Sequence, residues 1–168
     1  MKAVDVDARR YVWCRGQAIW RTSMPLTALL EDLRGALADG QEGLVRHTAR
    51  NIGTNCAVVL NLVVRHRKPL PPARMRAAWA LEGIAGHPLG DDCLTLVRSP
   101  RELDAAELTG IAERLVEGVR ELVGDVPDPM SPDGYFPALA TARDWLRLAD
   151  SVGVEGFLPR EWTSEEAH

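Results

Sequence analysis

Five polar side chains within residues 41–68 form the group best suited to chemistry in this sequence. They are His47, Arg50, Asn51, Thr54 and Asn55. Residues three or four apart lie one above another on a helix, so these side chains would share one face. A solvated helix face usually carries Glu, Lys and Gln, whereas His, Asn and Thr favour helix less and offer directional hydrogen-bonding groups. We therefore take this polar stripe as the candidate site.

The residue types of the stripe suit the recognition of a small polar molecule. Arg50 would present a guanidinium fork to an anionic or hydroxyl-bearing ligand, and Asn51, Thr54 and Asn55 would bind and orient it. Because imidazoles exchange protons near neutral pH, His47 is the candidate catalytic residue. A second interpretation stays open, in which the stripe ties the helix to its neighbours through buried hydrogen bonds.

Other classes of active site lack their sequence patterns. Carboxylate metal centres in helical bundles need Glu-x-x-His motifs on facing core helices, and the helices predicted here carry none, so we expect no metal and no cofactor. Nucleophile elbows and phosphate-binding glycine loops are also absent from the sequence. Cys56 is predicted to be an inert core thiol, and the row of Glu113, Glu117 and Glu121 to be a solvated face.

Composition indicates an ordinary globular protein. The 168 residues are predicted to form one domain, with 46% hydrophobic and 26% charged residues. A net charge of −4 argues against a nucleic-acid partner, for which a basic surface is typical. Three widely spaced cysteines favour reduced thiols, and the sequence has neither a long apolar run nor a signal-like start. We therefore expect a cytoplasmic protein that does not bind a membrane.

The elements that would position the stripe are helices. The stripe lies on a long helix predicted over residues 41–68, with Leu44, Ile52, Val59, Leu60 and Val63 turned inward. A preceding helix is expected to start at Ser23-Met24-Pro25 and to end near Asp39-Gly40, which makes an antiparallel hairpin with the long helix. Residues 1–22 contain no long helical pattern and are predicted to hold a short extended segment over 11–14 or a short helix over 16–20.

Shorter and later helices complete the predicted bundle. A helix over residues 73–84 follows the prolines at 69–72, and a short helix over 91–97 is expected to bury Leu94 and Val97. Asp104 and Glu107 form a capping box for a helix over 105–123, in which Leu108, Ile111, Leu115, Val119 and Leu122 are expected to face inward. A last long helix is predicted over 135–152, with a tail over 154–168 packed on the bundle. The fold class is therefore all-α, with about four long helices plus short ones.

Part of this helix order resembles a known domain. The segment LNLVVRHRKPLPPARMRAAWALEGI, followed by a short helix and the capped helix RELDAAELTGIAERLVEGVREL, resembles the helical substrate-binding domain of aminoglycoside-type nucleotidyltransferases. The resemblance covers residues 26–123. The catalytic sheet, with its Gly-Ser pair and paired aspartates, is absent from this sequence. The resemblance therefore implies a stand-alone helical module that holds a small polar substrate or is the partner subunit of a separate nucleotidyltransferase.

Two classes of function stay open at this stage. The first is a site for a small polar molecule, sugar-, amino-acid- or nucleotide-like, with or without acid–base catalysis by His47. The second is a helical interaction module, in which exposed Trp and Leu side chains meet a partner protein or a second copy of the chain. Substitution of His47 or Arg50 separates them, because a binding site loses its ligand whereas a buried network loses stability.

Overall fold

The computed structural model describes residues 3–65, 77–124 and 143–144, and these residues form helices and no β-strand. Four helices are long and two are short. They are α1 (Ala3–Ser23), α2 (Pro25–Ala38), α3 (Glu42–Val64), α4 (Ala77–Glu82), α5 (Gly90–Arg98) and α6 (Ala105–Val123). The predicted all-α class is confirmed.

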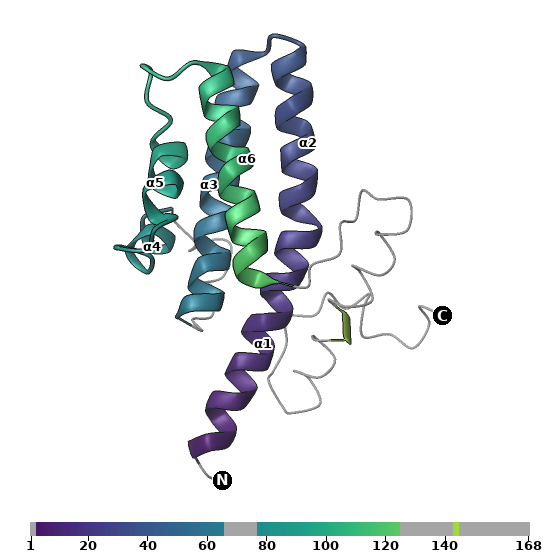
Figure 1. Ribbon diagram of the computed structural model, residues 1–168, viewed down its shortest axis with the longest axis vertical. Coiled ribbons are helices and arrows are strands. Elements are labelled where there is room, and N and C mark those ends of the chain that lie inside the picture. The colour runs from purple at the N-terminus through teal and green to yellow at the C-terminus, as the bar shows by residue number, and fades with distance from the viewer. Residues whose placement is uncertain (1–2, 66–76, 125–142, 145–168) are drawn as a thin grey trace.

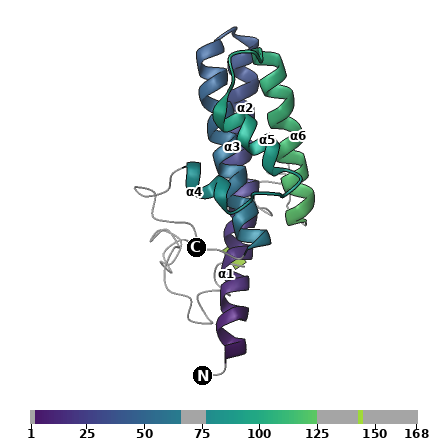
Figure 2. The same ribbon diagram turned by 90° about the vertical axis from the view of Figure 1, so that its left-hand side faces the viewer.

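Helix α3 occupies the centre of this bundle. It packs against each of the other five helices. Figure 1 shows α2, α3 and α6 running side by side, with α4 and α5 beyond α3, and Figure 2 shows α5 between α2 and α6. The α2–α3 turn and the α5–α6 connection lie at one end of the bundle, whereas α1 extends past the other end (Figure 1). The predicted long helix that carries the stripe is confirmed over Glu42–Val64, and the rest of the 41–68 prediction lies mainly outside the described residues.

The α2–α3 hairpin forms as predicted. Pro25 takes the first position of α2, where its missing N–H has no helical partner to lose. At the other end Asp39 is the C-cap; its N–H donates to the Gly35 carbonyl at 3.0 Å, and the Gly40 N–H donates to the Leu37 carbonyl at 3.1 Å. Gly40 has a φ of 67°, a left-handed conformation that glycine adopts without a Cβ clash. The chain therefore reverses directly into α3.

The prediction for residues 1–22 is wrong, because Ala3–Ser23 is one continuous helix. Helical hydrogen bonds cross the junction with α2: Met24 N–H donates to the Trp20 carbonyl at 3.0 Å, and Ala28 N–H to the Met24 carbonyl at 3.1 Å. Pro25 therefore bends a nearly continuous helical path instead of starting an isolated one. Apart from Ile19, the buried side of α1 consists of small or polar residues, which hides the helical pattern in the sequence. They are Cys14, Gly16, Gln17, Ala18, Thr22 and Ser23.

The apolar side of α3 agrees with the prediction except at its first turn. Ile52, Val59 and Leu60 are fully buried, whereas Leu44 is 45% exposed. The adjacent Val45 takes the inward position, where it lies with Leu37 of α2 and residues of α6. Successive residues on a helix point about 100° apart, so only one of the two can face the core.

Helix α5 approaches α3 closely, and this contact sets which of its residues are buried. Cys93 and Leu96 are fully buried, while Leu94 and Val97, the predicted inward pair, are only half-buried. The two buried residues face Gly53 of α3, where an added Cβ would lie 2.8 Å from Leu96 Cβ and 3.0 Å from the Cys93 carbonyl oxygen. Of the helix predicted over 73–84, α4 accounts for Ala77–Glu82, and residues 73–76 lie outside the described part.

Helix α6 has the boundaries and the cap that the sequence predicts. The Asp104 carboxylate accepts a hydrogen bond from Glu107 N–H at 2.7 Å, and Glu107 Oε2 accepts one from Asp104 N–H at 2.8 Å. Leu122, predicted inward, is 40% exposed, and Val123 is buried in its place. The predicted helix over 135–152, apart from residues 143–144, and the tail over 154–168 lie outside the described residues.

The contact between α3 and α5 at Gly53 is tested by adding one methyl group. Gly53→Ala should lower the free energy of unfolding by about 1–3 kcal/mol, because the backbone of α5 must move away from the new Cβ. Gly35 of α2 is the matched control, since nothing lies within 4 Å of its Cβ position. Gly35→Ala should stabilise by about 0.5–1 kcal/mol through helix propensity. Denaturant unfolding measures both changes, and equal stabilisation by the two substitutions would contradict the close approach.

Candidate functional site

The predicted stripe lies on one face of the amino-terminal half of α3. His47 and Arg50 are exposed, and Asn51, Thr54 and Asn55 are half-buried. The helix therefore brings all five side chains to one surface, as their spacing predicts. Toward the carboxyl end of α3 the same face becomes apolar, and its residues Val58 and Leu62 are buried.

Most hydrogen bonds of the stripe run along α3 itself. Asn51 Nδ2 lies 3.1 Å from His47 Nε2, a hydrogen bond in which the amide donates when the imidazole proton is on Nδ1. Asn55 Nδ2 donates to the Asn51 carbonyl at 2.9 Å, and Thr54 Oγ1 donates to the Arg50 carbonyl at 3.0 Å. These bonds fix the side chains and use part of their hydrogen-bonding capacity. The Asn51 amide oxygen and the His47 Nδ1 keep no partner among the described protein groups.

Two members of the stripe reach neighbouring helices. Arg50 Nε donates to the Val97 carbonyl in the last turn of α5 at 3.1 Å, a favourable place for a cation because carbonyl dipoles converge there. On the other side of the stripe, Asn55 Oδ1 accepts a long hydrogen bond of 3.5 Å from Arg21 Nη1 of α1. The stripe is thus bordered by α5 on one side and by α1 on the other.

Arg21 is a site residue that the sequence reasoning missed. Its guanidinium lies 5.7 Å from the ring centroid of Trp20, and its Nε is buried without a hydrogen-bond partner. Burial disfavours the charged form and lowers the pKa of Arg21. No helical periodicity in residues 1–22 indicated that this arginine would face α3. Arg21 could have been placed beside α3 only if residues 3–23 had been predicted to form a helix.

Asn61, farther along α3, has a structural role. It is fully buried, and its Nδ2 donates to the carbonyls of Ala57 at 2.9 Å and Ala80 at 2.7 Å. The second bond joins α3 to α4. Its Oδ1 lies against Gly83, where a Cβ would overlap it. Asn61 therefore holds α4 in place and is separate from the stripe.

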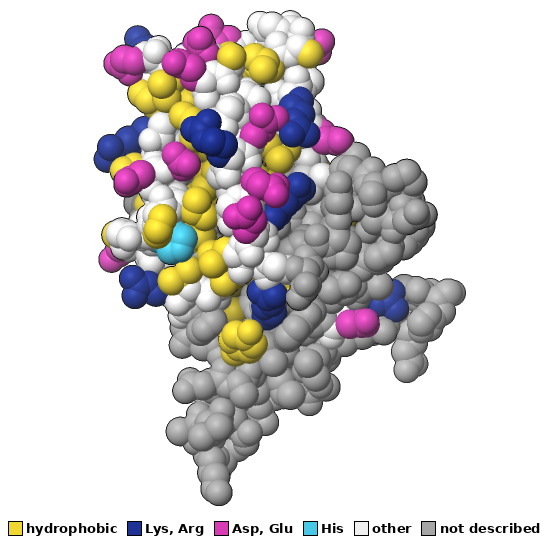
Figure 3. All heavy atoms as spheres, viewed as in Figure 1, with side chains coloured by type: hydrophobic (Ala, Val, Ile, Leu, Met, Phe, Trp, Pro, Cys, Tyr) yellow, Lys and Arg dark blue, Asp and Glu magenta, His cyan; other side chains and the backbone are white. Residues whose placement is uncertain are grey.

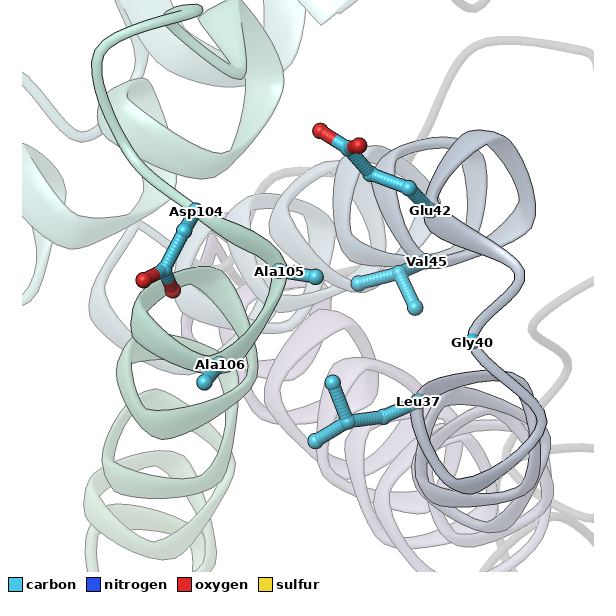
Figure 4. Close-up of a pocket in the computed structure, with 7 residues that line it drawn as sticks. All are labelled: Leu37, Gly40, Glu42, Val45, Asp104, Ala105 and Ala106. Carbon is cyan, nitrogen blue, oxygen red and sulfur yellow. The ribbon is translucent and has the colours of Figure 1, made fainter.

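A hollow of about 350 Å³ lies at the end of the bundle formed by the α2–α3 turn and the start of α6. Leu37, Val45 and Ala105 point into it, and Glu42 and Asp104 lie at its rim (Figure 4). Glu42 is paired with Arg46 at 2.8 Å, and Asp104 caps α6, so both carboxylates already have partners. The hollow contains no residue of the stripe.

The face formed by α2, α5 and α6 has a mixed surface. Acidic and basic side chains are interspersed over it, with apolar side chains between them (Figure 3). Of the acidic row on α6, Glu113 pairs with Arg34 of α2 at 2.8 Å, while Glu117 and Glu121 are exposed. The alternation of sign gives this face no extended basic patch, and the acidic row lies at the surface as predicted.

The three cysteines are buried and none is in a disulfide. Burial raises the pKa of the Cys93 thiol to about 12, with a further contribution from the nearby Asp92, and raises the pKa of Cys56 well above its usual value. Thiolates are the reactive form of cysteine, so these groups are poor nucleophiles in the folded protein. Cys56 thus behaves as the core thiol that the sequence predicts.

No three His, Cys, Asp or Glu side chains among residues 3–65, 77–124 and 143–144 lie together in a way that could hold a metal ion. None of the helices in those ranges is long and apolar enough to cross a membrane.

The buried thiols predict a loss of stability at alkaline pH. Both pKa values are higher in the folded chain than the ordinary 9.0, so the folded state holds these protons more tightly. Their contribution is present below about pH 9 and is lost as the pH rises toward about 12. The double variant Cys56→Ala/Cys93→Ala should show a flatter decline in unfolding free energy between about pH 8 and about pH 11 than the parent.

The control for that experiment is Val59→Ala, which removes buried volume on the same helix without removing a titrating group. It should lower stability at every pH and keep the parent slope. Equal slopes in the parent and in the double cysteine variant would show that the thiols do not titrate as their burial requires.

Comparison with models of protein families, with curated proteins and with solved structures finds no match to this chain.

Proposed function

We propose that the stripe on α3 binds a small polar molecule, such as a sugar-, amino-acid- or nucleotide-like compound. One observation carries the proposal: five polar side chains share one accessible face and are fixed by their own hydrogen bonds. A ligand that meets groups already held in position loses less conformational freedom on binding than one that must order them.

The stripe leaves several groups for a ligand. With its Nε on the Val97 carbonyl, Arg50 keeps its terminal nitrogens for an anion or a hydroxyl group. Asn51 keeps its amide oxygen as an acceptor. In the tautomer that accepts from Asn51, the imidazole of His47 has Nδ1–H as a donor. Catalysis by His47 would require a substrate proton within hydrogen-bond reach of this ring. Binding of the ligand does not depend on such catalysis.

A second candidate function is a helical interaction module or the partner subunit of a separate nucleotidyltransferase. Four large apolar side chains on the helices described are more than a third exposed, namely Tyr11 at 47%, Leu44 at 45%, Val64 at 43% and Leu122 at 40%. They belong to α1, to different ends of α3 and to α6, and apolar residues scattered singly are common on protein surfaces. The stripe therefore supports small-molecule binding better. We retain the cytosol as the location, on the cysteine content of the sequence.

Substitution of stripe residues tests the proposal. In a thermal-shift screen of sugars, amino acids and nucleosides, at least one compound should raise the melting temperature of the parent, because a ligand stabilises the state that binds it. Arg50→Ala and His47→Ala should each weaken that response by about tenfold or more, since charge-assisted hydrogen bonds are the strong contacts of such sites. Both residues are exposed, so each variant alone should melt within about 3 °C of the parent.

The matched control is Arg34→Ala, which removes an exposed arginine of α2 paired with Glu113. It should leave the ligand response unchanged. Early melting of both stripe variants, together with no response of the parent to any compound, would identify the stripe as a structural network and reject the proposed function.

A further inference from the structure

We infer that Arg21 of α1 is the anion-binding end of this site, so that its ligand carries a carboxylate or phosphate group. The inference rests on the proposed function of the stripe and adds the chemical class of the ligand. Arg21 comes from a different helix than the five stripe residues, and it meets them at Asn55.

The first observation is a guanidinium partly withdrawn from water without a counter-ion. In the part of the chain that the structure describes, no carboxylate lies within ion-pair distance of Arg21, and its one hydrogen bond goes to a neutral amide oxygen at 3.5 Å. Its Nε is buried and has no partner. Taking a charged group out of water costs several kcal/mol unless an opposite charge or good hydrogen bonds offset the loss. A long bond to an amide offsets little of it.

The second observation is that neighbouring groups hold the guanidinium at the edge of the stripe. Trp20 lies beside it at 5.7 Å, a distance at which an aromatic face attracts a cation, and Asn55 contacts its Nη1. Asn55 is itself fixed, because its Nδ2 donates to the Asn51 carbonyl. The guanidinium is therefore oriented without being neutralised. Among the described residues Nη2 has no hydrogen-bond partner, and it is not one of the buried unpaired atoms, so solvent can reach it.

Such an arrangement selects an oxyanion. A carboxylate or a phosphate group can accept two parallel N–H bonds from one guanidinium, which a neutral hydroxyl group cannot match. The remaining stripe groups, Asn51 and His47, would then contact the polar remainder of the same molecule. Amino acids and phosphorylated sugars or nucleosides have this combination, whereas neutral sugars and nucleosides lack the anionic group.

The test uses the full chain at low ionic strength, with inorganic phosphate and acetate as separate probes and chloride at matched ionic strength as the reference. Either oxyanion should bind saturably and shift the Nε–H resonance of Arg21 in nitrogen-labelled protein. Arg21→Gln should weaken binding of that anion by about tenfold or more. Arg34→Gln, the matched control on an exposed arginine, should bind as the parent does. A stronger response to phosphate assigns a phosphate group to the ligand, and a stronger response to acetate assigns a carboxylate.

Two results would overturn the inference. One is the absence of any saturable response of the Arg21 resonance to either oxyanion, and the other is equal anion affinity of the parent and Arg21→Gln. If Arg21→Gln fails to fold, Arg21→Lys replaces it, and it should bind more weakly than the parent because an ammonium lacks the planar fork.

The same experiments separate this inference from the proposed function. Neutral sugars or nucleosides that raise the melting temperature through His47 and Arg50, without any anion effect at Arg21, would retain the site and reject its anionic ligand class. Oxyanion binding that depends on Arg21 while no metabolite response depends on His47 or Arg50 would support the anion site and reject the stripe.

Discussion

The close packing of five helices around α3 is the constraint on which the rest of the structure depends. A helix surrounded in this way must be apolar or small on nearly every side. Where α5 crosses it, Gly53 has no room for a Cβ. Deeper in the bundle Val58 and Leu62 are buried on the side that carries polar groups nearer the start of the helix. The accessible hydrogen-bonding residues on this side of α3 therefore lie between His47 and Asn55, and they form the stripe.

Polar residues elsewhere in the bundle act differently from those of the stripe. Asn61 donates to a carbonyl of α4, and Arg46 donates to the carbonyls of Pro100 and Leu103 at 3.1 and 2.8 Å, which holds the chain before α6 against α3. These bonds join separate segments and satisfy backbone groups near the core, so their loss would be a loss of stability. His47, Asn51 and Thr54 bond only within α3. A pure fastening role would require bonds to other segments, and among the described residues Arg50 and Asn55 are the two stripe members that make them. This difference favours recognition over fastening for His47, Asn51 and Thr54.

Helix boundaries that depend on interactions between residues close in sequence could be predicted from the sequence. The start of α6 follows from the reciprocal bonds of Asp104 and Glu107, and the end of α2 from the Asp39-Gly40 turn, so both boundaries are readable in sequence. Helix α1 was not predicted, because its buried side is made mostly of small and polar residues whose burial depends on α3 and α6. The phase of α5 was missed for a similar reason, since Cys93 and Leu96 become its fully buried residues only where α5 packs on α3. The stripe was found because a four-residue spacing on one helix is visible in sequence, but Arg21 depends on how two helices meet.

Pro25 lies one helical turn after Arg21 and affects where Arg21 meets α3. It has no N–H for the carbonyl of Arg21 four residues earlier, so the path from α1 to α2 bends there. Side chains support the bend: Arg120 of α6 donates to Thr27 Oγ1 at 2.8 Å, and Thr27 Oγ1 donates to the Thr22 carbonyl at 3.5 Å. Arg21 lies in the last turn of α1, where the helix dipole favours a cation by about 0.3–1 kcal/mol. That gain is smaller than the several kcal/mol needed to desolvate a charge. The dipole and the Trp20 ring thus offset part of the cost of placing a cation at the bend, and the bound oxyanion that we propose would offset more of it.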